Sequence, residues 1–365
     1  MPDIVIVGGG AIGLAAARAL QKRGKSVVLC ERAQTGRAAS WASAGIVTAP
    51  SGPPNDPDYL LDALSWQQWP DFAAKLTEES GLDPEFRPIG CLIPAFDEHM
   101  AEGLDRAIHS GLLPEGKFLR DADLREAEPA LGPSVLAAVW RPGGNVENRR
   151  LCRALEIAAR AAGVEIRTAC EVRSIIVDGD RVQGVLTSDG VVRAEAVVVA
   201  SGAWSGAIVG GRPNVGVVPQ RGQILALDRG ATTLRQVILT PDDPYLVPRA
   251  DGRVVVGATR EMAGWDPAIT AGGVAWLLAR AIQIVPAFQN APIAEIWTGF
   301  RPLSPDGVPI IGPGEVAGMY FATGHGPSGI GPLPASIALL TALVLGEPPP
   351  ITAAPFSPLR FSSGM

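Results

Sequence analysis

The residues with the clearest chemical potential lie near the start of the chain, where the segment GGGAIG at residues 8–13 satisfies the pattern G-x-G-x-x-G. Glycines at this spacing allow a tight turn and a close approach of the backbone to a pyrophosphate, and the following helix would offer unpaired N–H groups. Glu31 comes about 20 residues later, where a carboxylate can accept hydrogen bonds from both ribose hydroxyls and would repel a 2′-phosphate. The pattern predicts a dinucleotide site, disfavours NADP, and leaves NAD and FAD open; a ligand-free strand–helix turn is the structural alternative.

A second glycine-rich turn lies near the end of the chain, in YFATGHGPSGIGPLPAS at residues 320–336. The segment has the pattern of a strand, a turn and the start of an apolar helix. A helix that begins directly after such a turn presents a partial positive charge to whatever lies in front of it. The sequence therefore predicts a second close approach of the backbone to a ligand.

These motifs need elements that position them. Residues 3–31 predict a strand, a helix and a second strand, which together form a right-handed βαβ unit. AEAVVVASGAW at residues 194–204 predicts another buried strand that ends at the ligand-binding edge of the sheet. The turns DGD and SDG, at residues 178–180 and 188–190, and the segment YLVPRADGRVVVGAT at residues 245–259 indicate antiparallel hairpins. Residues 33–57 are rich in small residues and are expected to form a loop. The alternation favours two interleaved domains.

Composition narrows the function classes. The chain has 365 residues, of which 47% are hydrophobic, so a sizeable core can form, and its net charge of −6 without a basic run argues against nucleic acid. Four scattered cysteines (Cys30, Cys91, Cys152 and Cys170) favour neither a metal cluster nor a disulfide framework, and we expect a cytoplasmic protein without a metal. Strand-like sequence begins at Asp3, so no signal peptide is expected, and the apolar segment at residues 333–346 is too short to span a bilayer. Peripheral membrane contact stays open.

At this point the chain resembles the FAD-dependent D-amino acid oxidase family, most closely its glycine oxidase and sarcosine oxidase-like members. The matching segments are IVIVGGGAIGLAAARAL with Glu31, GRAASWASAGI, VVVASGAWS, YLVPRADGRVVVGAT, GFRPLSPDGVPIIGP and FATGHGPSGIGPLPAS, in the family's order. The resemblance implies an α/β plus α+β fold, with a Rossmann-like FAD-binding domain of discontinuous segments and an interleaved antiparallel-sheet substrate domain. We place the FAD-binding domain at residues 1–87, 141–211 and 299–365, and the substrate-binding domain at residues 88–140 and 212–298.

The resemblance also implies the cofactor contacts. Val172 would meet the adenine through its backbone, and the late turn would pass under the isoalloxazine ring, with a helix N-terminus near N1 and the C2 carbonyl. Sarcosine oxidases of this family hold flavin through a late cysteine, and no cysteine follows Cys170, so we expect non-covalent FAD. The expected contacts are Gly8, Gly10, Ala11, Ile12, Gly13, Glu31, Arg32, Ala39, Ser40, Ala44, Gly45, Ile46, Val172, Gly202, Gly324, His325, Gly326, Pro327, Ser328, Gly329 and Ile330.

Two residues are expected to act on the substrate. Oxidation of an amine by flavin needs orientation and electrostatics more than acid–base groups. The guanidinium of Arg301 matches a carboxylate bidentately, and the resemblance places it over the flavin as the substrate anchor. Tyr245 resembles the family's active-site tyrosine, whose hydroxyl could bind the same carboxylate. The alternatives are a structural ion pair for Arg301 and a core position for Tyr245; for Arg221, in PQRGQ, we expect a structural ion pair.

The expected activity is oxidative deamination of a small amino acid or amine by hydride transfer to flavin N5, giving an imine that hydrolyses to an oxo acid, with reoxidation by O2 to H2O2. The alternatives are a dehydrogenase that passes electrons to a quinone or protein, and an FAD-binding subunit without turnover. Glycine oxidases that resemble this chain carry an arginine in the turn where Pro327 stands here. That difference weakens the assignment of glycine as substrate and leaves larger D-amino acids, N-substituted or cyclic amino acids and other amines open. A homo-oligomer is left open too.

Overall fold

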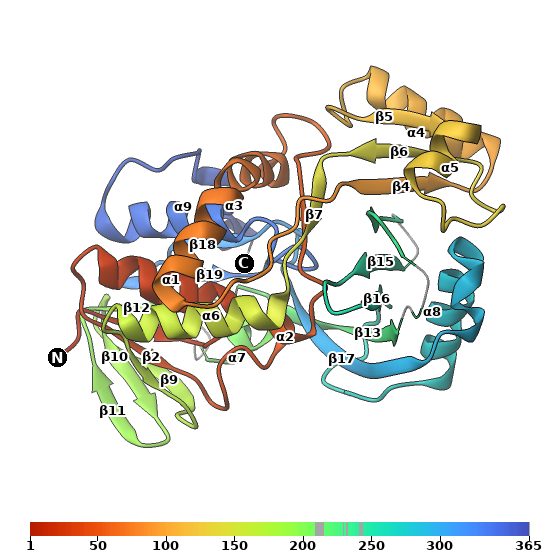
Figure 1. Cartoon of the computed structure of the whole chain (residues 1–365). Coiled ribbons are helices and arrows are strands. Elements are labelled where there is room, and N and C mark those ends of the chain that lie inside the picture. Colours follow the sequence, from red (N-terminus) through yellow and green to blue (C-terminus); the bar gives the residue numbers. More distant parts are fainter. Residues whose placement is uncertain (209–214, 229, 231–232, 241–243, 365) are drawn as a thin grey trace.

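The computed structural model describes residues 1–208, 215–228, 230, 233–240 and 244–364, and two large sheets dominate it (Figure 1). The first sheet has six strands in the order β18-β19-β12-β1-β2-β8. Its strands are β18 (Ile310–Pro313), β19 (Met319–Thr323), β12 (Ala196–Val199), β1 (Ile4–Val7), β2 (Val27–Cys30) and β8 (Glu165–Arg167). β1 pairs in parallel with both β12 and β2, as the expected βαβ unit requires. β18 alone runs antiparallel to its neighbour β19.

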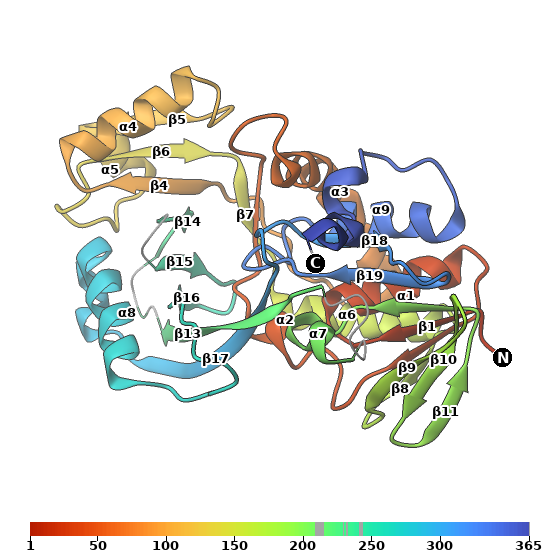
Figure 2. The same ribbon diagram turned by 180° about the vertical axis from the view of Figure 1, so that it is seen from behind.

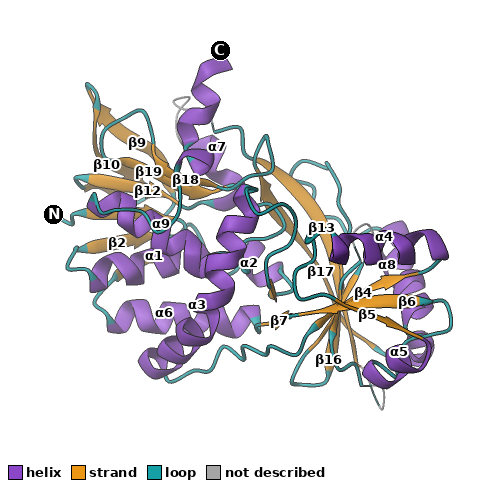
Figure 3. Ribbon diagram, turned by 90° about the horizontal axis from the view of Figure 1, so that it is seen from above, coloured by secondary structure: helices purple, strands orange, loops and turns teal. Residues whose placement is uncertain are grey.

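Two different layers cover the first sheet, because alternate residues of a strand face opposite sides. Ile4 and Ile6 of β1 pack against the helical layer, which is seen on one side of the sheet in Figure 3. Val5 and Val7 pack against a three-stranded antiparallel sheet on the other side. The helices are α1 (Ala11–Lys22), α3 (Pro57–Ser80), α6 (Asn148–Ala161) and α9 (Leu333–Leu345), and the three strands are β9 (Val172–Asp178), β10 (Arg181–Thr187) and β11 (Gly190–Arg193). Every residue of β1 and β2 is therefore buried.

The second sheet has eight strands in the order β17-β13-β16-β15-β14-β4-β6-β5 and lies beside the first (Figure 2). The strands are β4 (Cys91–Ala95), β5 (Lys117–Arg120), β6 (Ala137–Arg141), β13 (Val218–Asp228), β14 (Val237–Ile238), β15 (Tyr245–Pro248), β16 (Arg253–Gly257) and β17 (Ile293–Leu303). All neighbours pair antiparallel except β14 and β4, whose parallel pairing joins two distant parts of the chain. One face packs on α8 (Ala271–Ile284), through Leu277, Ala281 and Ile284. Helices α4 (Glu98–His109) and α5 (Asp121–Ala127) lie near β5 and β6.

The predicted fold class is confirmed: a parallel Rossmann-like sheet and a separate antiparallel sheet are built from interleaved segments. The exact domain limits stay a prediction. The limits proposed after residues 140 and 298 fall inside β6 and β17, and the limit after residue 211 lies outside the described residues. The predicted loop at residues 33–57 also contains a short helix, α2 (Ala39–Ala42), and the strand β3 (Ile46–Thr48), which pairs with β7 (Gly143–Asn145).

Candidate active site

A cavity of about 740 Å³ lies where the two sheets and their connecting loops meet. It brings together residues from both sheets and from the early and late glycine-rich turns. Of the predicted cofactor and substrate residues, the following line it: Gly8, Gly10, Ala11, Ile12, Glu31, Arg32, Ala39, Ser40, Ala44, Gly45, Ile46, Val172, Gly202, Tyr245, Arg301, His325, Gly326, Pro327, Ser328, Gly329 and Ile330. Gly13 and Gly324 do not line the cavity: Gly13 lies in the first turn of α1, and Gly324 directly follows β19.

The early turn brings the N-terminus of α1 to the cavity. A Cβ atom at Gly13 would lie 1.9 Å from the carbonyl oxygen of Gly8, so only glycine lets the helix start this close to the strand. Gly10 and Ala11 begin α1 at the cavity wall, and the Gly10 cap makes no side-chain hydrogen bond. A helix N-terminus in this position favours a bound anion such as a diphosphate.

Glu31 follows β2 and fixes the early turn from the side. Its carboxylate accepts hydrogen bonds from the backbone N–H of Gly9 at 2.7 Å and of Ala33 at 3.0 Å. The backbone N–H of Cys170 donates to the Glu31 carbonyl at 2.9 Å, which brings the start of β9 and Val172 to the same part of the cavity. A carboxylate acceptor and the backbone at the start of β9 thus lie where the sequence predicts ribose and adenine.

The short helix α2 is tied to the early turn and to the second sheet. The Ser40 hydroxyl accepts a hydrogen bond from the Ala11 N–H at 3.0 Å. The buried guanidinium of Arg249 donates to the Ala44 carbonyl at 2.9 Å and to the Val146 carbonyl at 2.7 Å. These contacts hold residues 39–46 against the cavity. The sequence did not reveal Arg249 as their anchor, because the partners of its guanidinium, which include two backbone carbonyls and the Asn148 side-chain oxygen, are more than 100 residues away.

The late turn places a buried histidine at the cavity wall. His325 is 3% exposed, and its Nε2 lies 3.1 Å from the Ser336 hydroxyl. Its Nδ1 is buried without a hydrogen-bond partner among the residues that the structure describes. Burial lowers the pKa of His325 to about 4, so the ring is neutral at physiological pH. The backbone N–H of Gly326 donates to the Pro302 carbonyl at 2.8 Å, which joins this turn to β17.

The cavity lining fits an extended dinucleotide. An acidic acceptor, the N-terminus of α1 and the glycine-rich late turn all line it. These groups suit the ribose, the diphosphate and the ring system of such a ligand. The arrangement therefore fits FAD, with Glu31 toward the ribose and the late turn toward the flavin.

The two predicted substrate residues meet on the second sheet. Tyr245 begins β15 opposite Gly257, and Arg301 lies on β17 opposite Gln220. Both side chains are half-buried. Burial lowers the pKa of Arg301 and raises the pKa of Tyr245. The charge of each group partly opposes the pKa shift of the other. Two glycines make room for them. A Cβ at Gly257 would lie 2.6 Å from the Tyr245 hydroxyl, and one at Gly222 would lie 2.7 Å from the Arg301 guanidinium.

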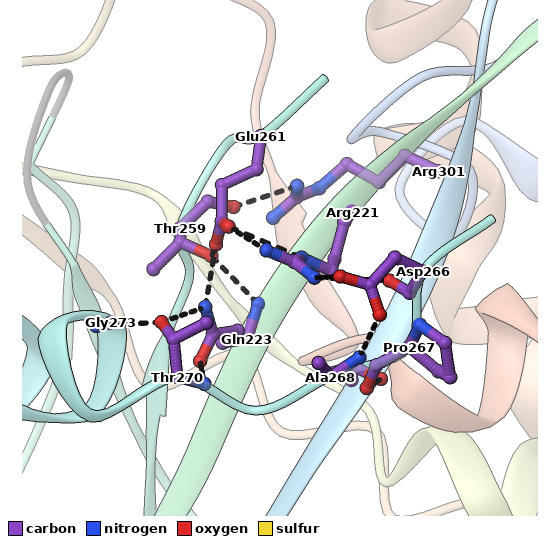
Figure 4. Close-up of polar contacts among 11 residues, drawn as sticks. Arg221, Gln223, Thr259, Glu261, Asp266, Pro267, Ala268, Thr270, Gly273 and Arg301 are labelled. Carbon is purple, nitrogen blue, oxygen red and sulfur yellow. Dashed lines mark hydrogen bonds and ion pairs between the residues drawn. The ribbon is translucent and has the colours of Figure 1, made fainter. Parts of the chain in front are cut away.

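Arg221 forms the structural ion pair that the sequence predicts. It binds Glu261 and, at 2.8 Å, the carboxylate of Asp266 (Figure 4). Glu261 also accepts a hydrogen bond from the Gln223 amide at 2.8 Å and one from the Thr259 hydroxyl. The Thr259 carbonyl accepts from the Arg301 guanidinium at 3.0 Å, so this network borders the substrate residues without entering the cavity.

Four charged residues of the described cavity lining were missed from the sequence: Arg260, Asp62, Glu171 and Arg173. Arg260 follows β16 and lines the cavity near Arg301 and Tyr245, where its charge affects the pKa of both. Asp62 on α3 also lines it, and burial, together with the nearby charge of Asp58, raises its pKa to about 7. Arg260 directly follows the segment YLVPRADGRVVVGAT, and that position was the available signal. No local pattern distinguishes Asp62 from other polar residues of a long helix.

His325 should make the folded protein sensitive to acid. Its pKa is about 4 when folded against 6.5 ordinarily, so the unfolded chain binds more protons between these values. The free energy of unfolding should therefore fall as pH drops through this window, by on the order of 3 kcal/mol from this residue. Denaturant unfolding at pH 7 and pH 4 should show a smaller loss for His325→Gln than for the wild type. The exposed His109 supplies the control, since His109→Gln should leave the acid sensitivity unchanged.

Comparisons with known proteins agree with this geometry. Residues 3–343 match the family model "FAD dependent oxidoreductase" (DAO). The chain is 36% identical to a glycine oxidase of Pseudomonas aeruginosa, over 97% of this chain and 98% of that protein. It is 35% identical to the bifunctional protein ThiO/ThiG of Synechocystis and spans about half of it, 54%. The crystal structure of glycine oxidase from Geobacillus kaustophilus superposes with a TM-score of 0.91 at 32% identity, covering 98% of each chain.

Proposed function

Because the chain belongs to the FAD-dependent oxidoreductase family, its cofactor is FAD, and we propose that it oxidises a small amino acid or amine that bears a carboxylate. One observation carries the choice of substrate class: Arg301 and Tyr245 meet at the cavity wall, on a sheet face that two glycines keep open. A guanidinium and a phenol at this place suit a carboxylate anchor. The glycine oxidases among its relatives are in accord with such a substrate.

The residues of the chain would orient the substrate. FAD held in this cavity would supply the two-electron acceptor for the carbon that bears the amine, with O2 as the final acceptor. Arg301 would hold the carboxylate bidentately, and the Tyr245 hydroxyl would donate a further hydrogen bond to it. His325 would keep its neutral ring in the late turn, because its Nε2 is already engaged by Ser336. The imine product would leave and hydrolyse in water to an oxo acid and ammonia or a primary amine.

Pro327 is exposed and lines the cavity at the position where the resembling glycine oxidases carry an arginine. Proline offers no cation, so glycine would lose a charge-assisted contact worth roughly 1.5–3 kcal/mol. We therefore propose that the substrate is an amino acid that offers more groups for binding than glycine does, such as an N-substituted amino acid.

The proposal is tested with the purified protein. We expect a yellow protein with a flavin spectrum, release of unmodified FAD on denaturation, and anaerobic bleaching of the flavin by at least one carboxylate-bearing amine. H2O2 formed in proportion to substrate would support the oxidase reaction, and turnover only with a quinone would replace it with a dehydrogenase. A flavin that no amine in the panel bleaches would contradict the proposal.

Location and assembly also stay proposals. Within the described ranges, the structure has no helix that is both long and apolar enough to cross a membrane. We propose a cytoplasmic location, which cell fractionation would test. Light scattering on a sizing column would determine whether the chain forms a homo-oligomer.

A further inference from the structure

Arg260 lies on the same wall of the cavity as the substrate residues. β16 ends at Gly257, and residues 258–260 follow it along the cavity. Ala258 and Arg260 line the cavity, whereas the Thr259 hydroxyl points into the network around Glu261. Arg260 is exposed and Arg301 is half-buried, which places Arg260 nearer the solvent. The two guanidinium groups therefore lie at different depths of one cavity.

The segment that carries Arg260 is held firmly on both sides. The backbone N–H of Arg221 donates to the Glu261 carbonyl at 2.9 Å, and that of Glu261 donates back to the Arg221 carbonyl at 3.0 Å. Further along, Asp266 pairs with Arg221, and the Thr270 N–H donates to the Gln223 amide oxygen at 2.8 Å (Figure 4). Binding residues supported in this way lose less freedom when a ligand arrives.

The charges of this part of the cavity favour an anion. The positive charge of Arg260 acts on both neighbours: with burial, it lowers the pKa of Arg301, and it opposes the rise in the pKa of Tyr245. Asp62 also lines the cavity, and its pKa of about 7 leaves it partly protonated at neutral pH. The walls of the same cavity include Ala258 and Ile224, which suit a short apolar spacer.

We propose that Arg260 binds a second carboxylate of the substrate, so that the enzyme prefers an amino acid or N-substituted amino acid with two carboxylates. Arg301 holds the carboxylate beside the reacting carbon, and Arg260 holds the outer one. This inference rests on the proposed function and specifies its substrate class. It also explains how the site can hold a second carboxylate although Pro327 of the late turn carries no charge. The second cation would be Arg260, which follows β16.

Binding without turnover gives the direct test. Thiodiacetate and (methylthio)acetate differ by one carboxylate, and both lack an oxidisable amine. We expect the FAD-loaded wild type to bind thiodiacetate roughly ten- to hundredfold more tightly, as measured by calorimetry. Arg260→Gln should abolish this preference and leave the affinity for (methylthio)acetate unchanged, whereas Arg260→Lys should keep part of it. Arg193→Gln, at an exposed arginine of β11 outside the cavity lining, makes the same charge change and should keep the full preference.

Equal binding of the two ligands by the wild type would overturn the inference, as would an equal loss of both ligands in Arg260→Gln. Turnover is measured separately with iminodiacetate and sarcosine, which also differ by one carboxylate. We expect a higher kcat/KM for iminodiacetate, and Arg260→Gln should remove the difference. If neither amine is oxidised while the thiodiacetate preference holds, the proposed reaction fails and the role of Arg260 stands. If both are oxidised equally well, the role of Arg260 fails alone.

Discussion

Replacing Arg301 with glutamine should lower kcat/KM for a carboxylate-bearing amine by roughly 30-fold to several thousandfold. Removing one partner of an enclosed, hydrogen-bonded charge pair costs about 2–5 kcal/mol. The fall should appear mostly in KM if the contact exists before and during reaction, and in kcat as well if the substrate loses its alignment. Steady-state kinetics with the best substrate of the panel would measure it.

Arg301 also donates a hydrogen bond to the Thr259 carbonyl at 3.0 Å, so a structural effect must be separated from a binding effect. Arg301→Lys is the matched variant: it keeps the charge and loses the planar fork, and should recover only part of the affinity. The melting temperature and the FAD content of both variants should stay close to those of the wild type. Unchanged affinity of Arg301→Gln for (methylthio)acetate would show that the carboxylate is bound elsewhere.

Gly13→Ala is expected to have the largest effect on cofactor retention and stability. The new Cβ would lie 1.9 Å from the Gly8 carbonyl oxygen, a backbone atom that cannot move without shifting β1 or α1. Overpacking of this kind costs typically 1–3 kcal/mol and more where backbone must shift, so we expect at least about 3 kcal/mol. The turn that presents the N-terminus of α1 would be displaced as well, so FAD should be lost. Thermal unfolding and the ratio of FAD to protein would measure both effects.

Gly272 provides a matched control in the first turn of another helix, α8. A Cβ there would meet no atom within 4 Å, and the backbone is helical. Gly272→Ala should therefore leave FAD binding unchanged and stabilise the fold slightly, by about 0.5–1 kcal/mol. If Gly13→Ala behaved like Gly272→Ala, the close helix–strand contact at the early turn would not be needed for the cofactor.

The early turn could be predicted from its amino acids alone, because its requirements are local. Glycines at positions 8–13 between a strand and a helix, with Glu31 after the next strand, are specified within about 30 residues of one βαβ unit. Tyr245 and Arg301 were predicted differently, through the resemblance of their segments to a family, and the structure places both at the cavity. The short helix α2 escaped prediction because four residues of Ala, Ser and Trp carry no helical periodicity.

Which distant side chains share the cavity depends on the packing of the whole chain. Arg260 and Arg301 come together because β13 lies between β16 and β17, an order that no local pattern encodes. The same order sets Gly222 and Gly257 where the guanidinium and the phenol need space. Asp62 reaches the cavity from α3, more than 150 residues before the nearest strand of the substrate residues. Turns follow from the backbone preferences of neighbouring residues, whereas the charges around a substrate depend on sheet order and on long-range packing.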